Sequence, residues 1–250
     1  FVNKNCVNSS DIYFIRQNKE KQAQQASELG INGCNDYESL IENSDILFLG
    51  VKPVVFPTLL PQIAKSVKKK NPLVVSMAAG LTTDSIKEML GYDAKIIRIM
   101  PNVNAAIAMS TTAVCKNEFA SDEDLATIKN LFSSIGLTTE VPENQFAIFT
   151  AIAGCSPAYV YMFIDGLARG AQKMGMNKQK ALEIAASAVI GSASMYAQSN
   201  EHPQELVDKV CSPGGTTIEG VTTLEEYKFT AGVVKAVENS ILKDRELSKK

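Results

Sequence analysis

The segment from Cys211 to Thr217 has the residue types and spacing best suited to binding a ligand. Its sequence, Cys-Ser-Pro-Gly-Gly-Thr-Thr, places hydroxyl side chains on both sides of a Pro-Gly-Gly turn. A turn of this kind between two helices leaves backbone N–H groups free to hold a carboxylate or a phosphate. A plain connection between helices rarely needs so many special residues, so we interpret this segment as an anion-binding loop.

Two further candidate segments follow apolar runs that have the composition of buried strands. One segment ends the run Ile46–Val51, and the other follows the run Leu73–Met77. In open α/β sheets, ligands bind at the carboxyl ends of the strands. Small residues there let a ligand approach the backbone closely, although strand ends without a ligand often have the same composition. The two segments are Val51-Lys52-Pro53 and Ala78-Ala79-Gly80.

The sequence contains no G-x-G, so neither a dinucleotide fingerprint nor a phosphate loop occurs in these 250 residues. A dinucleotide-binding domain would need its first strand and glycine-rich turn upstream of Phe1, with Ile12–Ile15 as its second strand. Arg16 and Asn18 follow that strand, and no carboxylate occurs before Glu20. NAD sites place an acidic residue here and NADP sites a cation. Arg16 therefore suits a 2′-phosphate, although a solvated arginine is the commoner interpretation of that residue alone.

Charge, histidine and cysteine content exclude several classes of protein. The 25 Lys and Arg residues are balanced by 27 Asp and Glu, without the basic cluster that nucleic acid requires. The single histidine, His202, leaves too little material for a zinc site or a Ser-His-Asp triad, so we expect no metal and interpret His202 as a helix-entry residue. Five scattered cysteines suit reduced thiols, and no uninterrupted apolar stretch approaches the ~20 residues that span a bilayer. We therefore expect a cytoplasmic protein.

The elements that must position these segments alternate between strands and helices in the first half of the chain. Gly30 closes the first helix, and a capping box from Ser121 to Asp124 opens the last one. This alternation predicts an α/β fold with a mainly parallel sheet that is covered by helices on both faces. The expected strands are Ile12–Ile15, Ile46–Val51, Leu73–Met77, Ile96–Met100, Ser110–Cys115 and Leu137–Val141, and the expected helices are Lys19–Leu29, Tyr37–Asn43, Val55–Val67, Asp84–Leu90 and Ser121–Ile135.

After Pro142 the pattern becomes helical throughout. Apolar residues at helical spacing form three stripes, which are rich in small residues and leave much apolar surface for one compact helical layer. We predict an all-helical domain that packs against its own copy in a dimer. The stripes are Val160, Phe163, Leu167, Ala171 and Met174; Leu182, Ala185, Ala186, Val189, Ile190 and Ala193; and Val233, Val237 and Ile241.

At these residues the sequence resembles pyrroline-5-carboxylate reductases. The most specific match is the family's signature, Ser212-Pro213-Gly214-Gly215-Thr216-Thr217. Weaker matches occur in the expected order over nearly the whole chain. They are Val51-Lys52-Pro53, Ala78-Ala79-Gly80, Arg98-Ile99-Met100-Pro101-Asn102, Pro157-Ala158-Tyr159-Val160 and Glu201-His202-Pro203.

The resemblance implies a Rossmann-type dinucleotide-binding domain over residues 1–142, without its first strand and Gly-rich turn, followed by an all-α substrate-binding and dimerisation domain over residues 143–250. It implies an NADPH-dependent oxidoreductase that reduces 1-pyrroline-5-carboxylate to L-proline in proline biosynthesis, with NADH as a possible cofactor. The expected assembly is a homodimer or a larger ring of dimers. No membrane or nucleic acid is expected as a partner.

The resemblance also implies roles for individual residues. Ser212, Gly215, Thr216 and Thr217 would bind the substrate, the last three holding its carboxylate through their amides. The hydroxyl of Thr217 would lie near the imine nitrogen as the catalytic group. The implied cofactor contacts are Arg16, Asn18, Val51, Lys52, Pro53, Ala78, Ala79 and Asn102.

Two alternatives stay open. The first is a related imine or hydroxy-acid reductase on the same scaffold. Hydroxy-acid relatives typically use a lysine in the helical domain, for which Lys173 is the nearest candidate. The second is a non-catalytic oligomeric binding protein on this scaffold.

Overall fold

The computed structural model describes residues 1–247, which form two compact units. The first unit comprises Phe1–Gly154 together with the segment that begins at Ile241, and the second comprises Cys155–Ser240. The first unit is an α/β unit that contains the sheet, and the second unit is helical. This arrangement confirms the predicted fold class. The domain boundary between residues 142 and 143 stays a prediction, since residues 143–154 have most of their contacts in the first unit here.

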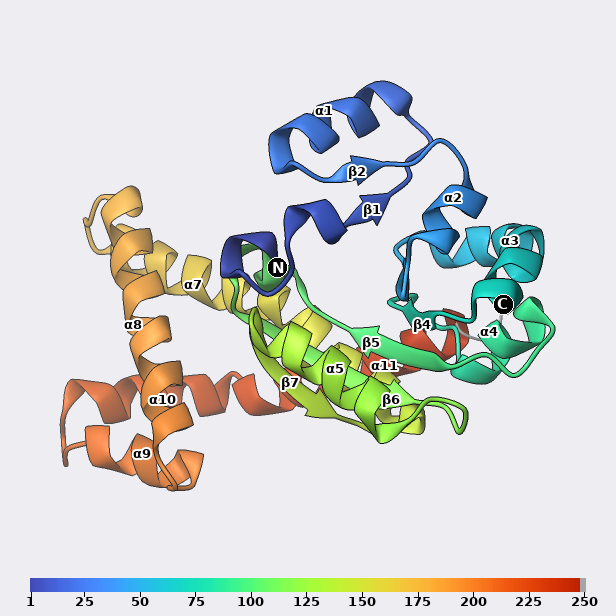
Figure 1. Cartoon of the computed structure of the whole chain (residues 1–250). Coiled ribbons are helices and arrows are strands. Elements are labelled where there is room, and N and C mark those ends of the chain that lie inside the picture. Colours follow the sequence, from blue (N-terminus) through green and yellow to red (C-terminus); the bar gives the residue numbers. More distant parts are fainter. Residues whose placement is uncertain (248–250) are drawn as a thin grey trace. The chain divides into compact units, whose positions relative to one another are not determined.

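A five-stranded sheet forms the centre of the first unit (Figure 1). The strand order is β3-β4-β5-β6-β7, and only the β5–β6 pair is antiparallel. All the predicted strands of this sheet are present, with small shifts at their ends. The strands are β3 (Ile46–Leu49), β4 (Leu73–Ser76), β5 (Ile96–Met100), β6 (Ser110–Lys116) and β7 (Gly136–Glu140).

Helices cover both faces of this sheet, because alternate strand residues point to opposite sides. Val74 packs on one face with helices whose side chains Phe56, Leu60 and Ile86 are fully buried. Val75, the next residue, packs on the other face, where α5 covers the sheet. The helices are α2 (Tyr37–Glu42), α3 (Phe56–Lys70) and α4 (Thr83–Leu90) on the first face and α5 (Asp122–Ser133) on the second, with α6 (Phe146–Phe149) following β7.

A separate two-stranded parallel sheet precedes the main sheet. It consists of β1 (Tyr13–Phe14) and β2 (Asn32–Gly33), which are connected by α1 (Lys19–Leu29). An apolar groove of about 330 Å³ lies between residues 12–15 and β3, so the two sheets do not join there. In the dinucleotide-binding strand order 3-2-1-4-5-6, this gap has the position of the first strand. The expectation that such a strand lies upstream of Phe1 stays a prediction.

Local capping residues set several helix ends where the sequence predicts them. Gly30 ends α1 with a φ of 66°, and Ser121 opens α5 in a complete capping box. His202 is the N-cap of α9 (Pro203–Val210), where its Nδ1 accepts a hydrogen bond from the amide of Gln204. Its predicted role at a helix entry is confirmed. The segment before β1 contains a 3-10 turn at Val2–Lys4 that Asn5 terminates with a φ of 56°.

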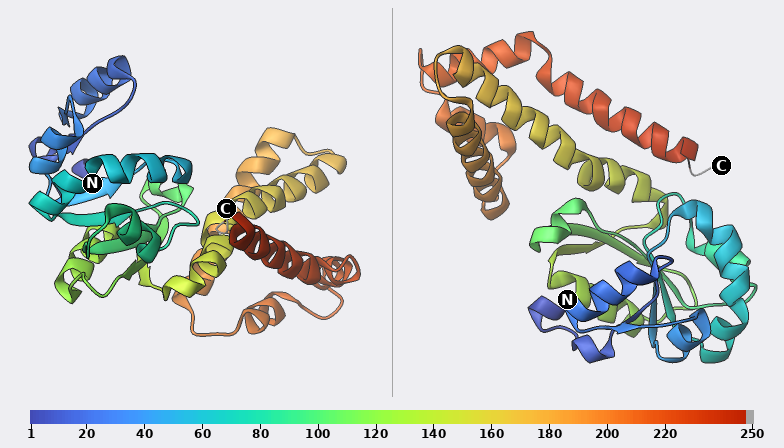
Figure 2. Two further views of the ribbon diagram at one scale, coloured as in Figure 1. Left: turned by 90° about the vertical axis from the view of Figure 1, so that its right-hand side faces the viewer. Right: turned by 90° about the horizontal axis from the view of Figure 1, so that it is seen from above.

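The second unit is entirely helical. Its helices α7 and α11 lie side by side (Figure 2). The ring of Phe163 in α7 packs against that of Phe229 in α11, with 5.9 Å between the ring centroids, and Tyr159 hydrogen-bonds Ser240. Besides α9, its helices are α7 (Ser156–Lys173), α8 (Lys178–Gln198), α10 (Thr216–Glu226) and α11 (Phe229–Leu247), the last of which continues into the first unit.

Much of the apolar surface of these helices is exposed in a single chain. Leu167 is 43% exposed and Ile190 is 64% exposed, although both belong to the predicted stripes. Among the described residues, the run Glu143–Lys173 is also long and apolar enough, by length and composition alone, to cross a membrane. A helix face of this kind must be covered by something apolar, and a second copy of the chain is one such cover.

Candidate functional site

The loop that the sequence marks as an anion site connects α9 to α10 in the second unit. Gly214 has a φ of 67°, a conformation that side chains other than glycine rarely adopt. The amide of Gly215 donates to the carbonyl of Ser212 at 3.0 Å, and a Cβ on Gly215 would collide with Oγ of Ser212. The two glycines therefore serve the turn itself, and the amide of Gly215 is occupied in closing it.

The amides of Thr216 and Thr217 begin α10 and have no acceptor within the helix. No side chain caps this helix end, and both threonines are exposed. Within residues 1–247, the hydroxyl of Thr217 has no hydrogen-bond partner. The positive end of the helix dipole lies here, so the arrangement suits a carboxylate.

Arg16 and Asn18 follow β1 in the first unit. Arg16 is exposed, and its Nη1 donates to Oε1 of Gln25 at 2.7 Å. Its backbone amide donates to Oε1 of the buried Gln22 at 2.8 Å, which holds the turn close to α1. The side chain of Asn18 caps α1 by accepting from the amide of Lys21 at 2.9 Å. Arg16 thus presents its guanidinium to solvent, whereas Asn18 has a structural role that the sequence prediction did not assign.

The other predicted cofactor residues lie along one edge of the main sheet, because they follow the parallel strands β3, β4 and β5. Val51, Lys52 and Pro53 are exposed. Ala78 is buried and its amide donates to Oγ of Ser76, whereas Ala79 is exposed. A ligand at this edge would meet the backbone more than the side chains.

The side-chain amide of Asn102, the last predicted cofactor residue, makes several hydrogen bonds within the protein. Its Nδ2 donates to the carbonyl of Ala153 at 2.9 Å. Its Oδ1 accepts from the amides of Asn104 and Thr111, both at 3.3 Å. Asn102 therefore fixes the loop after β5 to the π-helical segment Thr150–Cys155.

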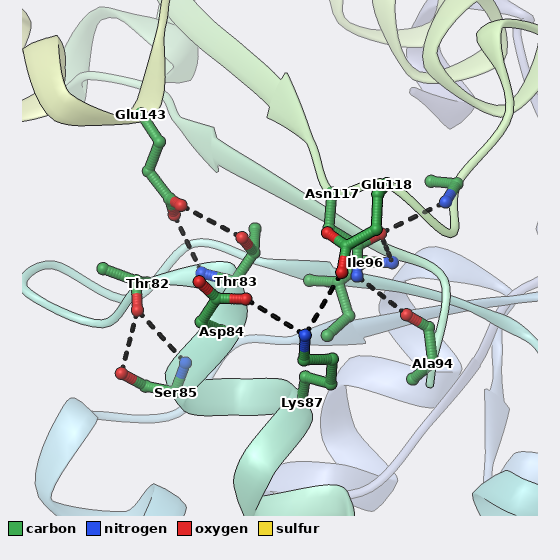
Figure 3. Close-up of polar contacts among 11 residues, drawn as sticks. Thr82, Thr83, Asp84, Ser85, Lys87, Ala94, Ile96, Asn117, Glu118 and Glu143 are labelled. Carbon is green, nitrogen blue, oxygen red and sulfur yellow. Dashed lines mark hydrogen bonds and ion pairs between the residues drawn. The ribbon is translucent and has the colours of Figure 1, made fainter. Parts of the chain in front are cut away.

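A buried polar cluster beside this edge is absent from the sequence prediction. Arg98, in the middle of β5, has a side chain that is 6% exposed and forms an ion pair with Glu143 at 3.3 Å between Nη1 and Oε1. The guanidinium also lies over the ring of Phe146, 4.5 Å from its centroid. Glu143 in turn accepts from the amide and the hydroxyl of Thr83, at 2.8 and 3.0 Å (Figure 3).

One sequence signal could have revealed this cluster. Arg98 interrupts the apolar run Ile96–Met100 in a strand that is otherwise buried. A buried cation is retained only with a partner, so an acidic residue had to reach it. The identity of that residue was hidden because Glu143 lies 45 positions along the chain.

The thiol of Cys115, which is 7% exposed, packs beside this cluster. Burial, together with the nearby carboxylate of Glu143, raises its pKa to about 12. Because a raised pKa keeps the thiol protonated at pH 8, and the thiolate is the reactive form, we expect iodoacetamide to leave Cys115 unmodified while it alkylates the exposed Cys6. Peptide mass spectrometry measures both sites. Equal modification of the two in the folded protein would contradict this assignment, and unfolding in urea should make them equal.

Among residues 1–247, no group of three or more His, Cys, Asp and Glu side chains is arranged to hold a metal ion.

Two family models of known proteins match the chain, one in each half. Residues 143–247 match the family described as pyrroline-5-carboxylate reductase dimerisation, and residues 1–80 match the family described as NADP oxidoreductase coenzyme F420-dependent. The chain is 40% identical to pyrroline-5-carboxylate reductase of Escherichia coli, over 95% of this chain and 88% of that enzyme.

Solved structures agree with this similarity. A 1-pyrroline-5-carboxylate reductase from Streptococcus pyogenes superposes with a TM-score of 0.88 at 36% identity, over 98% of this chain and 93% of that one. A pyrroline carboxylate reductase from Plasmodium falciparum with NADP bound gives a TM-score of 0.88 at 28% identity, over 99% and 91% of the two chains.

Proposed function

The chain belongs to the pyrroline-5-carboxylate reductase family, and from this we propose that it reduces 1-pyrroline-5-carboxylate to L-proline with NADPH in proline biosynthesis. The observation that carries the proposal is the signature loop at the N-terminus of α10, in a chain whose similarity to these reductases extends over both units. No observation of comparable specificity favours a hydroxy-acid substrate or a non-catalytic role. Lys173, the lysine considered for a hydroxy-acid reductase, is simply the exposed last residue of α7.

The geometry of the loop supports the roles that we propose for its residues. The amides of Thr216 and Thr217 are free to hold the substrate carboxylate, and Gly214 and Gly215 shape the turn that presents them. The amide of Gly215 can join them only by giving up its bond to Ser212. We propose that the hydroxyl of Thr217 donates a hydrogen bond to the ring nitrogen, which makes the neighbouring imine carbon more electrophilic.

The chain is an NADP-dependent oxidoreductase, and the first unit suits this cofactor. The carboxyl ends of β3, β4 and β5 lie at one edge, where Ala79 and Lys52 are exposed and the backbone is open to a ligand. Bound NADPH supplies the hydride for the reduction. The protein has only to orient the substrate ring, clamp its carboxylate and donate a hydrogen bond, so no cysteine or histidine nucleophile is needed.

The protein forms an oligomer through its dimerisation domain. The exposed apolar side chains of α7 and α8 are the surfaces that such an assembly would cover. We further propose that dimers associate into a ring and that the enzyme is cytoplasmic. The five cysteines, all free thiols, support the second statement, because reduced thiols are typical of that compartment.

The direct test follows NADPH absorbance when 1-pyrroline-5-carboxylate is added to the protein expressed from its complete reading frame, with NADH in parallel. Rapid oxidation that yields L-proline supports the proposal. A folded protein that binds NADPH but does not oxidise it with this substrate would move the assignment to another imine. A folded protein that binds no NADPH would favour the non-catalytic alternative.

Arg16 should set the preference for NADPH over NADH. Replacing Arg16 by alanine removes a charged donor, and we expect the KM for NADPH to rise about tenfold while that for NADH changes less than about twofold. Lys21→Ala removes another exposed cation from the neighbouring helix and serves as the matched control. Steady-state kinetics with both cofactors make the measurement. Equal losses with NADPH and NADH would refute the contact with the 2′-phosphate.

A further inference from the structure

Glu143 connects two parts of the first unit that are far apart in the sequence. It follows β7, yet its carboxylate accepts two hydrogen bonds from Thr83, the first residue of α4, 60 positions earlier (Figure 3). Both carboxylate oxygens are used, one by the amide of Thr83 and the other by its hydroxyl. A carboxylate is favoured at this helix end, where the dipole of α4 is positive.

The same carboxylate balances the buried charge of Arg98. Its Oε1 lies 3.3 Å from Nη1 of Arg98, and the side chain of Glu143 is 27% exposed. Phe146 covers the other side of the guanidinium. Within the described residues, Nε of Arg98 is buried without a hydrogen-bond partner, so Glu143 is the group on which the arginine depends.

These contacts fix the two loops to which the cofactor is assigned. The loop that carries Ala78 and Ala79 is held at its start by Ser76, whose Oγ accepts from the amide of Ala78, and at its end by Thr83 on Glu143. Arg98 pairs with Ser76 in the β-ladder and precedes the loop that carries Asn102 by a few residues. One carboxylate is therefore bonded to Thr83, at the end of the first loop, and to Arg98, in the strand that leads into the second loop.

We propose that Glu143 is a positioning residue for NADPH binding, acting through Thr83 and Arg98 on the loops after β4 and β5. This inference rests on the proposed function, because it assumes that those loops bind the cofactor. In this role Glu143 acts only through these two residues and does not itself touch the cofactor. Its loss should therefore weaken NADPH binding and leave the signature loop, and hence the affinity for the substrate, unchanged.

Thr83→Val removes the hydroxyl and leaves both the backbone bond and the ion pair in place. We expect the Kd for NADPH, measured by the quenching or transfer of nicotinamide fluorescence in the protein from its complete reading frame, to rise about 3- to 10-fold, the usual scale of one hydrogen bond. The KM for 1-pyrroline-5-carboxylate should stay within about twofold. Thr83→Ser retains the hydroxyl and should restore the original Kd.

Glu143→Gln tests the carboxylate itself and should raise the Kd for NADPH at least as much as Thr83→Val, since it also leaves Arg98 without its counter-charge. Glu118→Gln is the matched control. Glu118 also reaches α4, through Lys87 at 3.2 Å, but its side chain is 60% exposed and it touches neither cofactor loop (Figure 3). The Kd of the Glu118→Gln variant for NADPH should remain within about twofold of that of the unsubstituted protein.

The outcomes are separable. If Thr83→Val and Glu143→Gln lower the melting temperature while the Kd for NADPH stays unchanged, the cluster is structural only and the inference is overturned. It is also overturned if Glu118→Gln weakens NADPH binding equally, or if the KM for the substrate rises as much as the Kd for NADPH. Failure of the unsubstituted protein to bind NADPH would overturn the proposed function, and this inference with it.

Discussion

Replacing Thr217 by alanine is expected to lower the turnover of the reductase by roughly 5- to 150-fold, equivalent to about 1–3 kcal/mol of transition-state stabilisation. The structure supplies the reason. Thr217 lies at the exposed N-terminus of α10, and among residues 1–247 its hydroxyl bonds to no other group, so it is available to a substrate. A donor to the ring nitrogen matters most as that nitrogen gains electron density during hydride transfer. The loss should therefore fall on kcat more than on the KM for the substrate.

Thr223→Ala provides a matched control in the same helix. The hydroxyl of Thr223 donates to the carbonyl of Glu219 at 2.8 Å, so it is satisfied within the protein and should contribute nothing to turnover. Thr217→Ser keeps the donor and should recover most of the activity. Steady-state kinetics at saturating NADPH measure both parameters. A Thr217→Ala enzyme whose kcat stays within twofold of the original would remove Thr217 from the mechanism.

The fold was predictable because it depends on patterns that are local in the sequence. The run Ile46–Leu49 is apolar at every position, as a strand of a parallel sheet must be, and Ser121 with Asp124 carries its own capping signal. Residues at the ends of neighbouring parallel strands come together by topology alone. For this reason the amino-acid sequence is sufficient to assign the segments after β3, β4 and β5 to one edge of the sheet.

Contacts between residues that are distant in the sequence could not be predicted from local patterns. Asn102 is predicted to bind the cofactor, and its side chain also reaches Ala153, a partner that no local pattern reveals. Gly215 was predicted to offer its amide to the substrate, whereas the turn consumes that amide through Ser212. In both cases the residue type is right for the loop, and only the three-dimensional arrangement shows which of its groups remain available. The contacts of these residues with cofactor and substrate stay predictions.

A single charge in the helical unit should dissociate the assembly. Four residues of α8 recur at intervals of four, three and four positions and lie exposed on one face: Ile184, Ala188, Gly191 and Met195. Large residues at both ends and small residues in the middle let another helix approach closely. In the single chain, the exposed fraction of Ile184 is 48% and that of Met195 is 66%, which is high for apolar side chains. Both residues lie in the dimerisation domain. We therefore expect this stripe to be covered by a second copy of the chain.

Ala188→Asp places a carboxylate in the middle of that stripe. An unpaired charge buried in an apolar interface costs several kcal/mol, so we expect the dimer Kd to rise by about 100-fold or more. Ala188→Ser changes the same position without adding a charge and should leave the dimer intact. Sedimentation velocity over a range of concentrations compares both variants with the unsubstituted protein. Because folding of the single chain buries so little of α8, a variant that dissociates should keep its helical circular dichroism. If Ala188→Asp dimerises as well as Ala188→Ser, the partner copy binds elsewhere on the helical unit.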